Sequence, residues 1–262
     1  MIFTGFRPDT DDQRRADFDN DRVAWIRFGL DLRLGAAITT ENSDSFHPPR
    51  RKQKRSNFCV RFAMCRALEH AESRIGKPYD AYSPLFLAWH DAMQGDQGEN
   101  VGTQIYLSAQ AAHAIGICSE DLYPFEIMPE DYLARMRSRP NSETYVEAER
   151  HQIVESFRIA DGNIAEMLGA LGKGFGFVFG MPLRQSFFDS TQGDGGVVDN
   201  SGGAILGYHA MYGIDARVVN GKQFIVVDGS WGEAAHYLIP AGAFGTNEFR
   251  DLRVVVRAEE LA

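Results

Sequence analysis

The sequence predicts an α+β protein in which a helical part is followed by a sheet part. Apolar residues recur at helical spacing through most of the first half. In the second half, short apolar and aromatic runs alternate with glycine-rich turns, as strands do. The 262 residues, 44% hydrophobic and 24% charged, suffice for one soluble globular unit with a large core. Helices followed by strands favour α+β over an alternating α/β order.

The first expected helix begins at Cys59 and continues beyond Leu68. It carries a stripe with i, i+3, i+4, i+7 spacing: Val60, Ala63, Met64, Ala67, Leu68 and Ala71. Phe62 and Cys65 lie off this stripe, so we expect a central helix that is buried on more than one side. Further helices are expected from Ser83-Pro84, over 103–115, and within 129–150.

The sheet part is expected to open with a strand over 153–159 and a helix over 161–171. Five more strands are expected, over residues 175–179, 204–214, 223–227, 236–239 and 252–256. Residues 1–30 are interpreted as an N-terminal extension, a loose polar tail followed by an edge strand or loop at VAWIRFGL. Residues 31–262 form one domain, with a helical lobe at about 45–150 and a sheet lobe at about 151–262.

Charge and cysteine content exclude several classes of protein. A net charge of -9 argues against a general nucleic-acid binder, and the one dense basic run, 50–55, is most simply a solvated loop. Three widely spaced cysteines form no disulfide framework, which indicates a reducing compartment, either the cytoplasm or a virion interior. The N-terminus lacks the apolar segment of a signal peptide, and no apolar run is long enough for a membrane span.

Cys59 is the first candidate for chemistry. It follows a basic loop and starts a helix, and both the helix dipole and nearby cations favour thiolate over thiol. Most lone cysteines are small packing residues, so the functional interpretation needs a partner. His209, in a strand-like run, lies 150 residues later; a strand histidine alone is more often structural, but this separation suits a cysteine–histidine pair.

Several short segments, in order, resemble the papain-like cysteine peptidases, especially bacterial or phage members without a long propeptide. Pro48-Pro49, Gln53 and Cys59 match the start of the family's catalytic helix. Further matches lie at residues 31–33, 83–87, 100–104, 116–125, 207–210 and 229–232. The similarity covers about residues 31 to 240. It implies a two-lobed papain-like fold, with a helical lobe and an antiparallel β-sheet lobe.

The resemblance also implies site roles. Cys59 would attack the scissile carbonyl and form a thioester acyl-enzyme, with His209 as acid and base. The Gln53 side chain and the Cys59 N–H would form the oxyanion hole. Gly102 would let the substrate backbone approach, and Trp231 would shield the histidine from water. Tyr208 and Ala210, which flank His209, are expected to line a subsite.

One departure concerns the family's asparagine, which orients the catalytic histidine. The family has Asn-Ser-Trp-Gly where this chain has Gly229 to Gly232. Asp228 is a candidate replacement, although successive strand side chains point to opposite faces. A water molecule or a backbone carbonyl are the alternatives.

The sequence therefore predicts a cysteine endopeptidase acting on a protein or peptide substrate, without a metal or other cofactor. One alternative is a catalytically impaired papain-fold binding or structural module, which a cleft filled by the 190–204 loop would favour. Another is an amidase or transpeptidase. The first 30 residues are too few for the family's usual inhibitory prodomain, so control by propeptide removal is not expected. Residues 173–180 resemble an RNA-recognition signature, but no matching partner strand precedes them.

Overall fold

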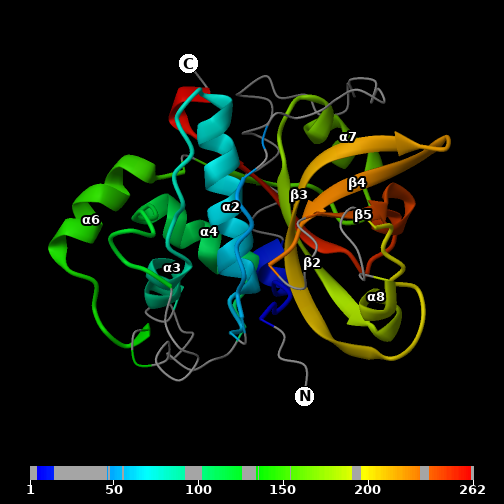
Figure 1. The fold of residues 1–262 in the computed structure, drawn as a ribbon, viewed down its shortest axis with the longest axis horizontal. Helices are drawn as coiled ribbons and strands as arrows, with labels where there is room; N and C mark the ends of the chain where they lie inside the picture. Colours follow the sequence, from blue (N-terminus) through cyan, green and yellow to red (C-terminus); the bar gives the residue numbers. More distant parts are fainter. Residues whose placement is uncertain are drawn as a thin grey trace.

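The helical half and the sheet half lie side by side in the computed structural model (Figure 1). The structure describes residues 5–14, 46, 48–54, 56–91, 102–125, 134, 136–153, 155–190, 196–230 and 236–260. The helical half contains α2 (Cys59–Arg74), α3 (Pro84–Asp91), α4 (Ile105–Ala114) and α6 (Ser142–Ala148), followed by the short 3-10 helix η2 (Glu149–His151). The helices expected at Cys59, at Ser83-Pro84 and over 103–115 are thus confirmed, with α4 slightly shorter than expected.

The sheet half is one six-stranded antiparallel sheet with the order β1-β6-β2-β3-β4-β5. Its strands are β1 (Glu155–Arg158), β2 (Phe177–Arg184), β3 (Ile205–Val219), β4 (Lys222–Asp228), β5 (His236–Pro240) and β6 (Arg250–Val256). Two helices, α7 (Ile164–Gly172) and α8 (Gln185–Ser190), and the 3-10 helices η3 (Ala241–Gly245) and η4 (Ala258–Glu260) accompany it. The predicted α+β class, with helices before strands, is confirmed.

Helix α2 is the central element between the two halves. Fourteen of its sixteen residues are buried, and its apolar side chains share one core cluster with residues of β2, β3 and β6, among them Val178, Tyr212 and Val255. A second cluster, rich in phenylalanine, fills the sheet half. The predicted burial of α2 on more than one side is therefore confirmed, and it fixes the helix N-terminus against β3.

The N-terminal segment, residues 5–14, is not the loose tail expected from its polar sequence. Phe6 and Asp9 are buried, Phe6 bridges to Thr103, and residues 11–14 are helical. The edge strand or loop expected at residues 23–30 lies outside the described residues. Among the helices that the structure describes, none is both long and apolar enough to cross a bilayer.

The aromatic cluster of the sheet half generates a stability prediction. Phe179 is fully buried and its ring contacts those of Phe177, Phe244 and Phe249. Phe179→Ala is expected to lower the free energy of unfolding by about 3–5 kcal/mol in urea denaturation, because the cavity cannot close fully. Val146→Ala, at a residue 58% exposed, is the control and should stay within about 0.5 kcal/mol. Equal effects of both substitutions would contradict this core.

Candidate active site

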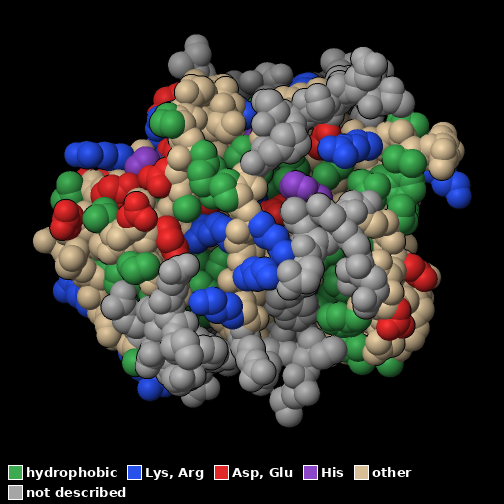
Figure 2. Space-filling model, viewed as in Figure 1, with side chains coloured by type: hydrophobic (Ala, Val, Ile, Leu, Met, Phe, Trp, Pro, Cys, Tyr) green, Lys and Arg blue, Asp and Glu red, His purple; other side chains and the backbone are tan. Residues whose placement is uncertain are grey.

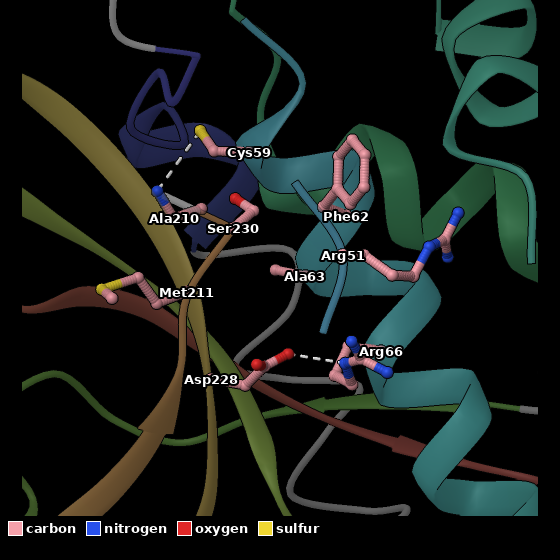
Figure 3. A pocket seen from close by; sticks show the side chains of 9 residues that line it. All are labelled: Arg51, Cys59, Phe62, Ala63, Arg66, Ala210, Met211, Asp228 and Ser230. Carbon is pink, nitrogen blue, oxygen red and sulfur yellow. Dashed lines mark hydrogen bonds and ion pairs between the residues drawn. The ribbon is translucent and has the colours of Figure 1, made fainter. Parts of the chain in front are cut away.

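Cys59 is the first residue of α2, and its thiol faces strand β3. The side chain is fully buried, and the backbone N–H of Ala210 donates a hydrogen bond to its sulfur at 3.4 Å. Figure 3 shows this contact at one end of a pocket between α2 and the sheet, which Arg51, Phe62, Ala63, Arg66, Met211, Asp228 and Ser230 also line. The sulfur thus lies at the junction of the two halves.

Burial dominates the ionisation of Cys59. Removal from water raises the pKa of its thiol to about 11, and this effect outweighs the backbone N–H groups of Ala210, Gly5 and Val60 and the charge of Arg61, all of which lower it. The helix dipole and the basic loop favour a thiolate, but burial favours the thiol in this arrangement. The free-energy cost of removing the thiolate from water exceeds the stabilisation that a few N–H dipoles give it.

Gln53 is held from both ends of its amide. Its Oε1 accepts a hydrogen bond from Ser230 Oγ at 2.6 Å, and its Nε2 donates to the carbonyl of Ser56 at 2.7 Å. The backbone N–H of Gln53 donates to the carbonyl of Ser230 at 3.1 Å. The loop before α2 is therefore tied to the end of β4 from the sheet half.

His209 lies in the middle of β3, next in the chain to the residue that contacts the Cys59 sulfur. It is fully buried and pairs across the sheet with Met181 of β2. Burial lowers the pKa of His209 to about 3, so the imidazole is neutral at neutral pH. Burial thus favours the neutral form of both Cys59 and His209 in this arrangement.

Asp228 binds a different partner from the one expected. Its Oδ2 accepts from Arg66 Nε at 2.5 Å (Figure 3), and it pairs in register with Tyr212. Strand alternation puts Ala210 and Tyr212 on the face toward α2 and His209 on the other. Asp228 is thus committed to Arg66 and lies on the opposite face of the sheet from His209.

Gly229 leaves no room for the asparagine that the resembling family has at this position. A Cβ atom there would lie 2.5 Å from Tyr237 Cε2 and 2.9 Å from Met211 Cε. Tyr237 is itself almost fully buried. The space of the family's third residue is therefore filled by apolar side chains.

The remaining candidate residues fall into three groups. Gly102 and Ala210 are buried at the junction of the two halves, and Tyr208, two residues before Ala210 in β3, is 40% exposed. Trp231 lies outside the described residues. Across the described ranges, no three His, Cys, Asp or Glu side chains group as metal ligands do.

The basic loop at residues 50–54 is only partly exposed to solvent, whereas the sequence alone suggested a fully solvated loop. Arg51 binds Glu69 at 3.0 Å, Glu120 at 2.8 Å and the Tyr82 carbonyl at 2.7 Å. Figure 2 shows Lys and Arg side chains gathered along the middle of this face, where the two halves meet. The surroundings of the junction are therefore locally basic although the whole chain is acidic.

The solved structures that resemble this chain include several cysteine proteases. Xylellain, a cysteine protease from Xylella fastidiosa, superposes with a TM-score of 0.74 at 20% identity, over 97% of this chain and 96% of that one. The chain has the papain-like fold. Procathepsin L 3 from Tenebrio molitor larval midgut gives 0.63 at 15% identity over 93% and 91%, and procathepsin B from Trypanosoma congolense gives 0.59 at 16% over 88% and 88%. No protein-family model matches the sequence, and a comparison with curated protein sequences finds no match.

Sequence reasoning assigned no role to several residues that surround Cys59 in this candidate site. Arg66 and Ser230 fix the elements around Cys59, and Gly5 lies against its sulfur. An arginine in a helix that is apolar on most sides is a signal for a buried ion pair. Gly5 offered no such signal, because its place depends on distant chain segments.

The side chains packed around Gly229 predict how the protein responds when the family's asparagine is introduced there. Gly229→Asn is expected to lower the free energy of unfolding by about 1–3 kcal/mol, because Tyr237 and Met211 must move. Gly242→Asn, where nothing lies within 4 Å of the added Cβ, is the matched control and should change little. A Gly229→Asn variant as stable as the control would show that the site has room for the side chain.

The pKa of Cys59 predicts how its reactivity depends on pH. Only the thiolate reacts with iodoacetamide, so the alkylation rate of the full chain should keep rising above pH 9.0 toward about pH 11. Stability should fall over the same interval, because the unfolded thiol ionises first. Peptide mapping by mass spectrometry separates Cys59 from Cys65 and Cys118. A plateau of the Cys59 rate below neutral pH would contradict this ionisation behaviour.

Proposed function

We propose that this protein is a cysteine endopeptidase whose nucleophile is Cys59 and whose acid and base is His209. The observation that supports it most is the hydrogen bond from Ala210 N–H to Cys59 Sγ. This contact joins the N-terminus of α2 to the strand residue next to His209. This contact supports the proposal because the backbone next to the proposed base touches the proposed nucleophile at the junction of the two halves, where a papain-like site would lie.

The first half of the reaction forms a thioester. In the active form the Cys59 proton passes to His209, and the thiolate attacks the carbonyl carbon of the scissile bond. Collapse of the tetrahedral intermediate breaks the carbon–nitrogen bond, and the His209 imidazolium gives its proton to the leaving amine. The product amine leaves, and the acyl group stays on Cys59.

The second half hydrolyses the thioester. His209 takes a proton from water as the oxygen attacks the acyl carbon, and it returns that proton to the Cys59 sulfur. The oxyanion of both intermediates would be bound by the Cys59 backbone N–H and the amide of Gln53. Ser230 supports this role for Gln53, because its hydroxyl fixes Oε1 and so defines Nε2 as the donor end. Such a donor contributes on the order of 3 kcal/mol to the barrier reduction.

A non-catalytic papain-fold module is the second candidate, and three observations favour it. Cys59 and His209 are both fully buried. Strand alternation turns the His209 side chain to the face of β3 away from α2. Gly229 provides no side chain to orient the imidazole. An amidase or transpeptidase would use the same acyl-enzyme with a different substrate or acceptor. The experiment below separates the catalytic candidates from the module.

Cys59→Ala is expected to abolish hydrolysis of a fluorogenic peptide library, because no thioester can form. Cys65→Ala and Cys118→Ala are matched controls, since both thiols are buried and free and have no role in the reaction. His209→Asn should lower kcat by at least about 100-fold, the usual contribution of a general acid–base group. Hydrolysis that survives Cys59→Ala would contradict the mechanism, and absence of hydrolysis in all proteins would favour the module.

A further inference from the structure

A closed circuit of hydrogen bonds joins α2, the chain before it and the end of β4. Arg66 Nη2 donates to the Pro49 carbonyl at 3.0 Å, and Arg66 Nε donates to Asp228 Oδ2 at 2.5 Å. Ser230 Oγ donates to Gln53 Oε1 at 2.6 Å, and the backbone N–H of Gln53 donates to the Ser230 carbonyl at 3.1 Å. Short stretches of backbone, from Pro49 to Gln53 and from Asp228 to Ser230, close the circuit.

The contacts of Asp228 and Ser230 both lie on the side of the sheet that faces α2. Asp228 binds Arg66 of α2, and Ser230 binds Gln53 in the loop before α2. Figure 3 shows both side chains between the sheet and α2, with the contact between Asp228 and Arg66. The end of β4 is therefore held from the helical half at two points that are two residues apart.

Gly229 separates these two points. Glycine has more backbone conformations than any other residue, so Gly229 alone does not fix the direction in which the chain leaves β4. That direction depends on the contacts on either side, from Asp228 to Arg66 and from Ser230 to Gln53. The buried ion pair therefore limits the positions that the Ser230 hydroxyl can take.

The Ser230 hydroxyl in turn orients the amide of Gln53. It donates to Oε1, while Nε2 donates to the Ser56 carbonyl at 2.7 Å. Nε2 has two hydrogens and can therefore serve a second acceptor. Without Ser230, the amide would be free to turn over and present its oxygen in place of its nitrogen. The hydroxyl thus decides which end of the amide is the donor.

We propose that Arg66 and Asp228 are positioning residues for the Gln53 amide, and that they act through Ser230. The inference rests on the proposed function for the oxyanion that this amide would bind. The ion pair fixes the end of β4, Ser230 holds Oε1, and Nε2 remains the donor. Its effect should appear in the transition state rather than in substrate binding, because the oxyanion forms only when the carbonyl is attacked.

A second ion pair on α2 provides a matched control. Arg74 Nε donates to Glu260 Oε1 at 2.5 Å, and both side chains are mostly buried. Arg74 also donates to the carbonyls of Gly174 and Val255. This pair joins the C-terminal end of the same helix to distant parts of the chain, and none of these groups belongs to the circuit around Gln53. Glu260→Ala therefore removes a comparable carboxylate from α2 without changing that circuit.

The first test measures how fast the Gln53 side-chain amide hydrogens exchange with water, by ¹⁵N NMR of the full chain. Their signals are assigned by their loss in Gln53→Ala. Asp228→Ala should speed the exchange at least about tenfold, and Asp228→Asn, which keeps an oxygen for Arg66, at least about threefold. Glu260→Ala should match the wild type. Unchanged exchange in Asp228→Asn and Asp228→Ala, with native circular dichroism, would overturn the proposal.

A double substitution tests the route through Ser230. Asp228→Asn is used because it keeps the size of the side chain and one acceptor oxygen. In a Ser230→Ala background it should change the exchange of the Gln53 amide by less than about twofold, because the connecting hydroxyl is already absent. An effect of equal size with and without the Ser230 hydroxyl would show that the ion pair does not act through this residue.

Peptide hydrolysis, measured in parallel, gives the kinetic signature of a positioning role. Asp228→Ala should lower kcat at least about tenfold and change KM by less than about twofold. In a Gln53→Ala background the same substitution should have little further effect on kcat, because the donor that it positions is gone. Glu260→Ala should leave kcat unchanged. A loss of kcat in Glu260→Ala as large as in Asp228→Ala would reduce the effect to general destabilisation and reject the positioning role.

The two measurements together separate this proposal from the proposed function. Faster amide exchange with a loss of kcat that depends on Gln53 supports both. Faster exchange in a protein without any hydrolysis supports the fixation of Gln53 by the ion pair and counts against the peptidase. Hydrolysis by the wild type, with effects of Asp228→Ala and Gln53→Ala that multiply, supports the peptidase and rejects the positioning role.

Discussion

The arrangement of the site depends on one guanidinium group. Arg66 lies on α2 two turns beyond Cys59 and donates to Asp228 of β4, to Glu69 of α2 and to the Pro49 carbonyl in the chain before Gln53. Burial alone would lower its pKa, but the two carboxylates outweigh burial and raise it. One side chain thus joins the helix that begins at Cys59, the chain before Gln53 and the strand that ends at Asp228. Breaking a buried pair of this kind typically costs about 3–5 kcal/mol.

The same burial that strengthens this pair opposes the ionisation that catalysis needs. The Cys59 thiol lies against β3 and His209 is fully buried in that strand, so burial favours the neutral form of each. The proposed reaction therefore requires an arrangement in which water reaches the sulfur, where the backbone N–H groups at the start of α2 would favour the thiolate.

Local patterns predicted the elements but not their long-range partners. The buried stripe of α2 and the proline at the start of α3 follow from spacing and chain geometry, which sequence displays directly. Strand alternation also argued against Asp228 as a replacement for the side chain missing at position 229, and Asp228 is bound by Arg66. The papain-like fold was predicted from a series of short motifs, each weak alone.

What could not be predicted lies in contacts between distant segments. Residues 5–14 have a polar sequence without periodicity, so nothing local indicates that Phe6 is buried with its ring against Gly180. The raised pKa of Cys59 could not be predicted from the helix dipole and basic loop, because burial is a property of the whole fold. For the same reason Gly229 looked like a lost side chain, while the structure shows its space occupied by Tyr237 and Met211.

The most direct test of the account is labelling with a peptidyl vinyl sulfone, an electrophile that a cysteine peptidase dyad activates. The full chain and its His209→Asn variant would be incubated with the probe, and the labelled site would be mapped by mass spectrometry. We expect one adduct, on Cys59, that is lost in His209→Asn, with Cys65 and Cys118 unlabelled. Absence of the Cys59 adduct in the full chain, or an adduct that forms equally fast without His209, would contradict the account.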